Sequence, residues 1–272
     1  MSLARRVEAR YEELSPGERR ACDAFLAHEG EIALFASTEL ASIAGVSPAT
    51  LSRLYKRLGY ADVAELREEE RSLRAAGVPV ADGVPADLGA FAAQEARQLK
   101  KALASVADGS LGQAAGLIAG APRVIVVGTR SSYPAALHLR SQLSQVLGTV
   151  SLAPAPGQSL GEELEELPEG SVVFLVAFRR RAAVVPRLVA ALEVSGASLV
   201  VIADGSARAH ARRAEVWLEC PVGSPGPFDS SGAAMSLVCV LANEVAALAD
   251  AAGRQRVRRV SALYESLAEI EG

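Results

Sequence analysis

The stretch STELASIAGVSPATLSRLYKRLGY, residues 37–60, has the pattern of two short helices joined by a sharp turn. Apolar residues before the turn recur at helical spacing: Leu40, Ala41, Ile43 and Ala44. Gly45 follows where that spacing stops, as expected of a residue that tolerates positive φ at a helix end. Ser47 and Pro48 are residue types preferred at the N-cap and at the first position of the next helix.

The second helix has two chemically different faces. Leu51, Leu54 and Leu58 form one apolar stripe that would pack against the first helix. The opposite face offers hydrogen-bonding and cationic groups suited to a DNA major groove, and no acid occurs between Leu40 and Ala61. The pattern favours a DNA-binding helix-turn-helix over a helical hairpin with a solvated face. The residues expected at DNA are Thr38, Ser47, Ala49, Thr50, Ser52, Arg53 and Lys56.

Further helices are expected on both sides of this pair. An amphipathic helix is predicted over residues 2–14, and Ser15, Pro16 and Glu18 form a capping-box start for a helix to about His28. Asp62 and Glu65 repeat that start for a helix through about residue 75. The segment GVPVADGVPADLG, residues 77–89, is rich in glycine and proline and indicates a linker. We therefore predict an all-α domain over residues 1–76 and a second domain over 90–272.

The second domain has the alternating pattern of an α/β fold. A helix is expected over residues 91–107, followed by short Val- and Ile-rich runs that alternate with helical patterns. Such alternation predicts a parallel sheet covered by helices on both faces. The five expected strands are 124–127, 150–152, 172–178, 199–203 and 216–218. The expected helices are 133–147, 182–194, 207–211, 230–251 and 254–270, and the last two offer apolar stripes for a dimer interface.

Composition limits the class of protein. The chain has 272 residues, 50% hydrophobic residues and a net charge of −4, which is consistent with a globular protein that has one local basic face. Neither a membrane span nor a signal peptide is recognisable, so a cytoplasmic location is expected. The cysteines and histidines lack metal-ligand spacing, and the cysteines have apolar neighbours typical of core positions. No metal and no cofactor is expected. The cysteines are Cys22, Cys220 and Cys239, and the histidines are His28, His138 and His210.

A ligand of an open α/β sheet lies beyond the carboxyl ends of its strands, where the strand order reverses. Two loops there are candidates, GTRSS after the first strand and three arginines after the third. Backbone N–H groups, hydroxyls and guanidinium groups can hold an anion, although turn chemistry and a solvated surface explain the same residues. The candidate ligand residues are Gly128, Thr129, Arg130, Ser131, Ser132, Arg179, Arg180 and Arg181. In the turn at residues 223–231, Asp229 and Ser230 are expected to cap the following helix.

Both halves, in this order, resemble the RpiR-type bacterial transcription regulators. The family pattern ELAxxAGVSxATxxRxxRxLG is matched from Glu39 to Gly59, except that Lys56 stands at the second arginine of the pattern and Arg57 follows it. The remainder is similar to the family's sugar isomerase (SIS) domain, which implies a five-stranded parallel sheet, phosphosugar sensing and dimers. Two loops depart from the SIS pattern, because Arg130 replaces the second glycine of GxGxS and the SxSGxT loop is absent. Either the arginines bind an anion instead, or the effector is not a phosphosugar, or the domain only dimerises.

The resemblance implies a transcription regulator that is not an enzyme. Its partners would be a double-stranded DNA operator, a small anionic effector such as a phosphosugar, and further copies of the chain in a homodimer or tetramer. The alternative is a phosphosugar isomerase with an appended helical domain, in which Glu244 or His138 would be the nearest candidate general base. A third possibility is a DNA-binding protein whose SIS domain is purely structural.

Overall fold

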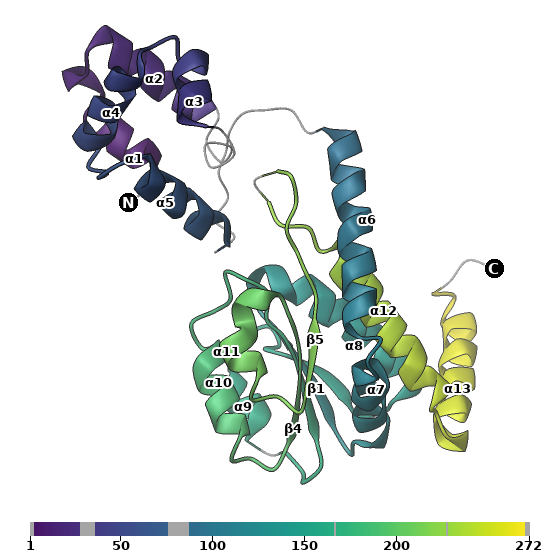
Figure 1. Cartoon of the computed structure of the whole chain (residues 1–272). Helices are drawn as coiled ribbons and strands as arrows, with labels where there is room; N and C mark the ends of the chain where they lie inside the picture. Colours follow the sequence, from purple (N-terminus) through teal and green to yellow (C-terminus); the bar gives the residue numbers. More distant parts are fainter. Residues whose placement is uncertain (1–2, 28–35, 76–86, 166, 227, 270–272) are drawn as a thin grey trace. The chain divides into compact units, whose positions relative to one another are not determined.

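The computed structural model describes residues 3–27, 36–75, 87–165, 167–226 and 228–269 (Figure 1). Apart from the short segment 225–228, these residues separate into two compact units whose boundary lies between Leu88 and Gly89. The first unit is helical in its described residues and the second is an α/β unit. Most of the predicted linker, residues 77–86, lies outside the described residues.

The helical unit is built around the predicted helix pair. Its elements are α1 (Leu3–Glu8), η1 (Tyr11–Glu13), α2 (Pro16–Ala27), α3 (Ser37–Ile43), α4 (Pro48–Arg57) and α5 (Val63–Ala75). The prediction of one helix over residues 2–14 is wrong, because helix α1 ends at Glu8 and a 3-10 turn follows. Arg19 of α2 donates to the carbonyl oxygens of Glu12 and Leu14, at 2.7 and 3.2 Å, and so holds this segment in its turn.

The apolar stripe of α4 forms the centre of this unit's core. Leu51, Leu54 and Leu58 are buried, and they pack with Leu40 and Ala41 of α3. The Tyr55 ring stacks on that of Phe25, with 5.8 Å between the centroids, which ties α4 to α2. The predicted division of α4 into a buried leucine face and an outward polar face is confirmed.

The predicted capping box of α2 is also confirmed, and it extends into an ion pair with α4. The Ser15 N–H and hydroxyl both donate to the Glu18 carboxylate, and Arg57 lies 3.2 Å from the same oxygen. Burial alone raises the pKa of the Glu18 carboxyl, but the Ser15 bonds and the Arg57 charge outweigh it, so the pKa lies below its ordinary value of 4.5.

This lowered pKa makes the stability of the helical unit depend on pH. The stabilisation from Glu18 is present above pH 4.5 and is lost as the pH falls through the lower pKa of the folded state. We expect Glu18→Ala to lower the free energy of unfolding by about 2 kcal/mol at neutral pH. Urea unfolding of both proteins, followed by circular dichroism, should show this difference shrinking at pH values below 4.5. A difference that stays constant through that range would refute the assignment.

The α/β unit contains a five-stranded, all-parallel sheet, as predicted, and the strand order is β2-β1-β3-β4-β5. The strands are β1 (Val124–Gly128), β2 (Val150–Ala153), β3 (Val172–Val176), β4 (Ser198–Ala203) and β5 (Val216–Glu219). The helices are α6 (Leu88–Ser105), α7 (Ser110–Gly120), α8 (Tyr133–Val146), α9 (Leu160–Leu164), α10 (Val185–Leu192), α11 (Arg208–Ala211), α12 (Gly232–Ala247) and α13 (Ala251–Leu267), with 3-10 turns η2 (Arg130–Ser132) and η3 (Gly205–Ala207).

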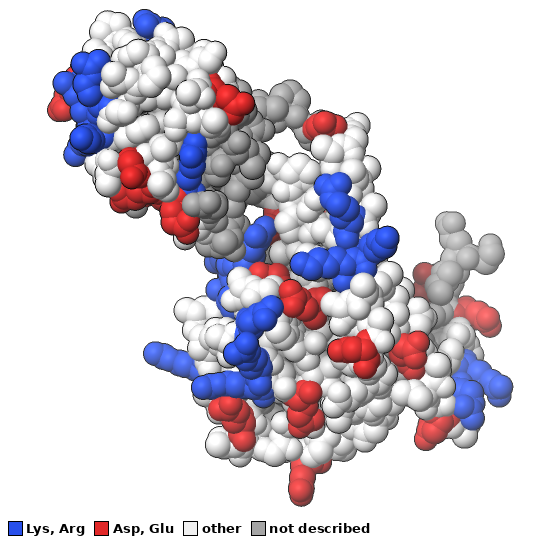
Figure 2. All heavy atoms as spheres, viewed as in Figure 1, with Lys and Arg blue, Asp and Glu red and all other residues white. Residues whose placement is uncertain are grey.

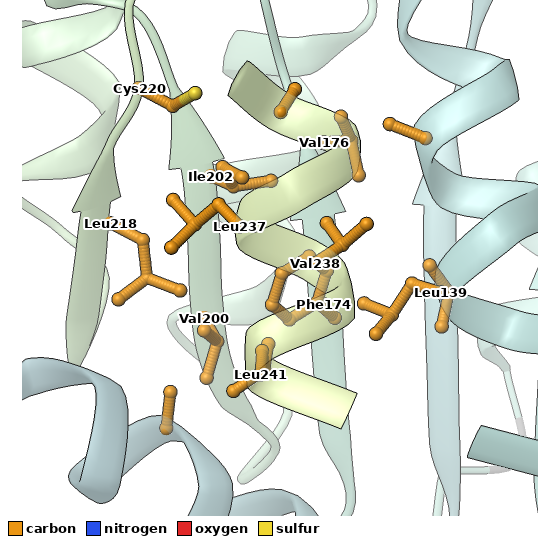
Figure 3. Packing of buried hydrophobic residues seen from close by; sticks show 14 of the residues in the cluster. Leu139, Phe174, Val176, Val200, Ile202, Leu218, Cys220, Leu237, Val238 and Leu241 are labelled. Carbon is orange, nitrogen blue, oxygen red and sulfur yellow. The ribbon is translucent and has the colours of Figure 1, made fainter. Parts of the chain in front are cut away.

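Alternate side chains of each strand supply two separate cores. Phe174 and Val176 face the core formed with α7, α8 and α12, whereas Val173 and Leu175 face the core formed with α10 and α11. Figure 3 shows Leu237 and Val238 of α12 packed over the strand side chains of the first core. The predicted arrangement, with helices on both faces of a parallel sheet, is confirmed (Figure 1).

Two helices of this unit have no counterpart in the sequence prediction. Helix α7 has the sequence SLGQAAGLIAG, in which glycine lowers helix propensity and no charged face marks the periodicity. Helix α9 spans only Leu160–Leu164, which is too short to show a period. The third strand is shorter than predicted, because it ends at Val176 and the chain then turns into the candidate ligand loop.

Two expectations from composition can be compared with the structure. Cys22 and Cys220 are buried, as predicted for core residues, and burial raises the pKa of each thiol to about 12.

Among the described residues, no single helix has the length and apolar content of a membrane span. Helices α12 and α13 have that length and apolar content only when taken together, and they meet at a bend of 116°.

Candidate DNA-binding surface and effector site

The turn between α3 and α4 has the geometry that its sequence predicts. Gly45 has a φ of +61°, and the Val46 N–H donates to the Ala41 carbonyl at 3.0 Å, which closes the end of α3. Ser47 is the N-cap of α4, and its hydroxyl accepts from the Thr50 N–H at 3.2 Å. These bonds fix the direction in which α4 leaves the turn.

The residues predicted to contact DNA point outward from this helix pair. Thr38, Ser47, Ala49, Ser52, Arg53 and Lys56 are exposed, and Thr50 is half-buried. The hydroxyls of Ser47 and Thr50 lie 3.0 Å apart, and Arg53 Nε donates to the Ala49 carbonyl at 3.3 Å. Figure 2 shows a cluster of basic groups on the side of the helical unit where α4 lies in Figure 1. The outer face of α4 therefore presents hydroxyls and cations together.

Acidic side chains near α4 are occupied by the protein's own N–H groups. Glu39 accepts from the Ala36 N–H at 2.6 Å, and Asp62 accepts from the first N–H groups of α5. The Arg57 side chain of α4 turns toward α2 instead of solvent, because it donates to the Glu18 carboxylate and to the Glu13 carbonyl. These contacts leave Arg53 and Lys56 as the cations of the outer face of α4 among the described residues.

Sequence reasoning missed one cation at this surface, Arg20 of α2. A Cβ added at Gly17 would lie 3.8 Å from the Thr50 methyl group and 3.9 Å from Arg20 Nη2, so this part of α2 lies beside Thr50. Arg20 is exposed, so its guanidinium extends the outward face beside Thr50. Only the packing of α2 on the turn brings these residues together, and no spacing in the sequence indicates it.

The second candidate site lies at the carboxyl edge of the sheet, where the connections from β1 and β3 diverge. Gly128 ends β1 in close contact with α8, since an added Cβ would lie 2.4 Å from the Ala136 Cβ. Ser132 is buried, and its hydroxyl accepts from the Phe178 N–H at 3.1 Å. This bond joins the loop after β1 to the loop after β3, so the two predicted ligand loops are neighbours.

Two arginines of these loops have left-handed backbone conformations. Arg130 has a φ of +54° and Arg180 a φ of +58°, values that glycine adopts more readily. Both side chains are exposed, and neither forms an ion pair with a described residue. Thr129 is half-buried and Ser131 is exposed beside Arg130. These residues form the part of the edge that is open to solvent.

The other two arginines are bound to carboxylates of the same chain. Arg179 Nε lies 3.1 and 2.9 Å from the two Asp229 oxygens, and Arg179 Nη2 also bonds Asp229. The Asp229 hydrogen bond raises the pKa of the Arg179 guanidinium. Arg181 Nη2 lies 3.4 Å from Asp204 and 2.7 Å from the Ser206 hydroxyl. Two of the three arginines predicted to clamp an anion are therefore already neutralised by carboxylates of the chain.

Sequence reasoning missed the two acids that hold these arginines. Asp229 does not cap α12 as predicted, because it binds Arg179, and the Ser230 hydroxyl accepts from the Gly232 N–H instead. Asp204 directly follows β4 and accepts from the Arg179 N–H at 2.7 Å. An aspartate at the end of a buried strand was the available signal for Asp204.

The fold and the surfaces define a two-domain protein: a helix-turn-helix unit with an outward cationic face, and a parallel α/β unit in which two arginine-bearing loops meet at the carboxyl edge of the sheet. Residues 1–69 match the family model of the helix-turn-helix domain of the rpiR family, and residues 117–244 match that of the SIS domain. The chain therefore belongs to the RpiR-type regulators, with an rpiR-family helix-turn-helix domain followed by a SIS domain.

Solved structures show the same fold. The SIS domain of an RpiR transcription factor from Sphaerobacter thermophilus is 22% identical, with a TM-score of 0.58 over 63% of this chain and 96% of that one. The Vibrio vulnificus NanR protein, complexed with ManNAc-6P, is 17% identical, with a TM-score of 0.59 over 98% of this chain and 99% of that one. A protein of E. coli CFT073 is 16% identical, with a TM-score of 0.52 over 65% of this chain and 95% of that one. No curated protein matches the chain.

Proposed function

We propose that this regulator binds double-stranded DNA through α4 and senses a small anionic metabolite at the carboxyl edge of its SIS sheet. The observation that carries the DNA-binding part is the outward face of α4, on which Thr50, Arg53 and Lys56 are solvent-accessible while the leucines are buried. Hydroxyls and cations on a helix of this kind suit base edges and phosphates of a major groove. Residues 1–76 would form the DNA-binding domain and residues 90–272 the effector domain, joined by a linker at 77–89.

The proposed effector is a sugar phosphate or a similar anion. The NanR protein is complexed with ManNAc-6P, which supports a phosphosugar by analogy. In this chain Arg130 and Arg180 would contact the anion, because they are exposed and lack carboxylate partners among the described residues. Arg179 and Arg181 would shape the site through Asp229 and Asp204.

The protein would act as a dimer that places two copies of α4 on successive major grooves. An effector changes DNA affinity only if it binds one arrangement of the dimer better than another. Such coupling is reciprocal, so the DNA should alter the apparent affinity for the effector by the same factor.

Two measurements on the full chain test this function. Duplexes enriched from a random pool on the wild-type protein should bind it with an affinity that a panel of sugar phosphates shifts. The same panel should raise the melting temperature of the wild type more than that of Arg130→Ala/Arg180→Ala. A panel that shifts neither DNA affinity nor melting temperature would favour a purely structural SIS domain, and absence of any enriched duplex would refute DNA binding.

Arg20 should add a phosphate contact that carries no sequence information. We expect Arg20→Ala to weaken binding to all duplexes by a similar factor and to reduce the salt slope by about 1. Glu13 is an exposed acid of the same unit, so the Glu13→Ala protein serves as a surface control, and its affinity for DNA should not fall. An Arg20→Ala protein with the wild-type salt slope would remove this residue from the proposed surface.

An isomerase is the alternative to a regulator, and the position of the catalytic candidate Glu244 does not favour it. Glu244 is twelve residues along α12 from Gly232, which corresponds to about 18 Å of helix. That length of helix separates Glu244 from the start of α12, which lies near Asp229 and its partner Arg179 in the loop after β3. Turnover of a sugar phosphate by the purified chain would be the result that reinstates the enzyme.

A further inference from the structure

The first half of helix α6 is attached to the α/β unit by a polar contact. The helix begins at Leu88, at the end of the predicted linker, and its buried residues are Gln98 and Ala102. Ala102 belongs to the apolar core, so Gln98 is the buried attachment point of the part of α6 that precedes it. The Gln98 amide group donates to the carbonyl oxygen of Gly223, in the connection between β5 and α12, which lies next to α6 (Figure 1). The position of the first half of α6 therefore depends on that connection.

The same connection is fastened to the candidate effector edge by Arg179. The Arg179 guanidinium binds both carboxylate oxygens of Asp229, and it also lies beside Gly223, where an added Cβ would be 3.5 Å from Arg179 Nη2. The Ser230 N–H donates to the Val222 carbonyl at 2.8 Å, which joins the two ends of the connection. Gly223 thus lies next to both the arginine of the effector edge and α6.

The contact between α6 and this connection is incompletely paired. Gln98 Oε1 and Glu95 Oε1 are buried atoms, and neither has a hydrogen-bond partner among the described residues. Glu95 Oε2 lies against Gly232 at the start of α12, since an added Cβ there would collide with it. Buried oxygen atoms without a donor cost free energy, so this arrangement is not the one that would stabilise the contact most. A shift of α6 that gave these oxygen atoms donors would recover that cost.

We propose that Arg179, Asp229 and Gln98 couple the effector edge to α6 and, through α6, to the DNA-binding unit. Asp229 occupies Arg179 as an internal anion, and an effector anion held by the neighbouring Arg180 competes with it for the same guanidinium. Release of Asp229 loosens the connection, α6 loses its bond to Gly223, and the point at which the linker joins the α/β unit moves. The effector favours this arrangement because it binds it better. This inference deepens the proposed function and rests on it.

Hydrogen exchange of the full chain tests the coupling without DNA and without a metabolite. Asp229→Asn keeps the shape of the side chain but removes the charge that binds Arg179. Amide exchange in the first half of α6 should therefore become at least about threefold faster, while the strand amides keep their wild-type rates. Asp250→Asn is the matched control, because Asp250 is an exposed N-cap that asparagine replaces well. Wild-type exchange of α6 in Asp229→Asn, or equal acceleration throughout the unit, would overturn the proposal.

A double-mutant cycle on DNA affinity tests the route through Gln98. Asp229→Asn alone should change the affinity of the full chain for an enriched duplex at least about fivefold, the lower end of typical allosteric coupling. The same substitution should have little effect when it is combined with Gln98→Leu, which removes the bond to Gly223, and its full effect when it is combined with Gln94→Leu. Gln94 is the matched control, because it lies about one turn earlier on α6 and bonds Arg97 of the same helix.

The outcomes separate this coupling from the function on which it rests. Additive effects of Asp229→Asn and Gln98→Leu on DNA affinity would overturn the route through α6 while leaving a DNA-binding regulator. A wild-type chain that enriches no duplex would refute the proposed function, and the exchange rates of α6 in Asp229→Asn would still decide whether the effector edge is coupled to this helix.

Discussion

The double charge reversal Arg53→Glu/Lys56→Glu should abolish sequence-specific DNA binding. Both cations are exposed on the outer face of α4, beside the hydroxyls of Ser52 and Thr50. The reversal replaces two attractive phosphate or base contacts with two repulsive ones, and each lost contact removes about one unit of salt slope. We expect the affinity for an enriched duplex to fall by at least about a hundredfold, since a single good base contact contributes about 1–3 kcal/mol.

The control for this experiment is a reversal of equal charge elsewhere. Arg187 of α10 and Lys101 of α6 are exposed residues of the α/β unit. The protein Lys101→Glu/Arg187→Glu has the same net charge as the α4 variant and should lose far less affinity. Equal losses in both variants would show that net charge, rather than the face of α4, determines binding.

Asp204→Ala should cause a large loss of stability in the α/β unit. Its buried carboxylate accepts from the Arg179 N–H, the Ser206 N–H and Arg181 Nη2. The Arg181 and Asp204 side chains are only 18% and 11% exposed, so removing the acid leaves a poorly hydrated guanidinium. We expect the free energy of unfolding to fall by about 3–5 kcal/mol, the range found when one partner of a buried ion pair is removed.

Unfolding of this unit can be followed separately from that of the helical unit. Trp217 of β5 is the single tryptophan of the chain, so its fluorescence reports the strand next to β4. Asp204→Asn keeps one acceptor oxygen and should lose less stability than Asp204→Ala. A change of less than about 1 kcal/mol in the alanine variant, within the range of ordinary surface substitutions, would show that the ion pair does not hold this edge together.

The fold was predictable where a local pattern coincided with burial. The leucines of α4 have a helical period, and the strands are short apolar runs rich in Val and Ile. Ser15, Gly45 and Ser47 mark helix ends by chemistry that operates within a few residues. Helix α7 escaped prediction because its small residues have no polar face for a period to show. Its burial depends on the sheet and α12, which lie far away in the sequence.

The location of the candidate ligand site could be predicted from the sequence, but the partners of its side chains could not. Strand topology alone puts Arg130 and Arg179 at one edge of the sheet. The partners of the arginines come from the residue after β4 and from the loop before α12, at sequence separations of 23 to 50 residues, and no local pattern specifies them. Arg20 is a similar case, because only the packing of α2 places it on the same side of the unit as Thr50.

The chain's own lysines provide a direct test of the surface proposed to bind DNA. Lys56 lies on the outer face of α4, while Lys100 and Lys101 of α6 belong to the other unit, and the sequence has no further lysine. Acetylation rates can be measured by mass spectrometry with and without an enriched duplex. The account predicts that bound DNA slows acetylation of Lys56 severalfold and leaves Lys100 and Lys101 unchanged. Full duplex occupancy with an unaltered Lys56 rate would contradict it.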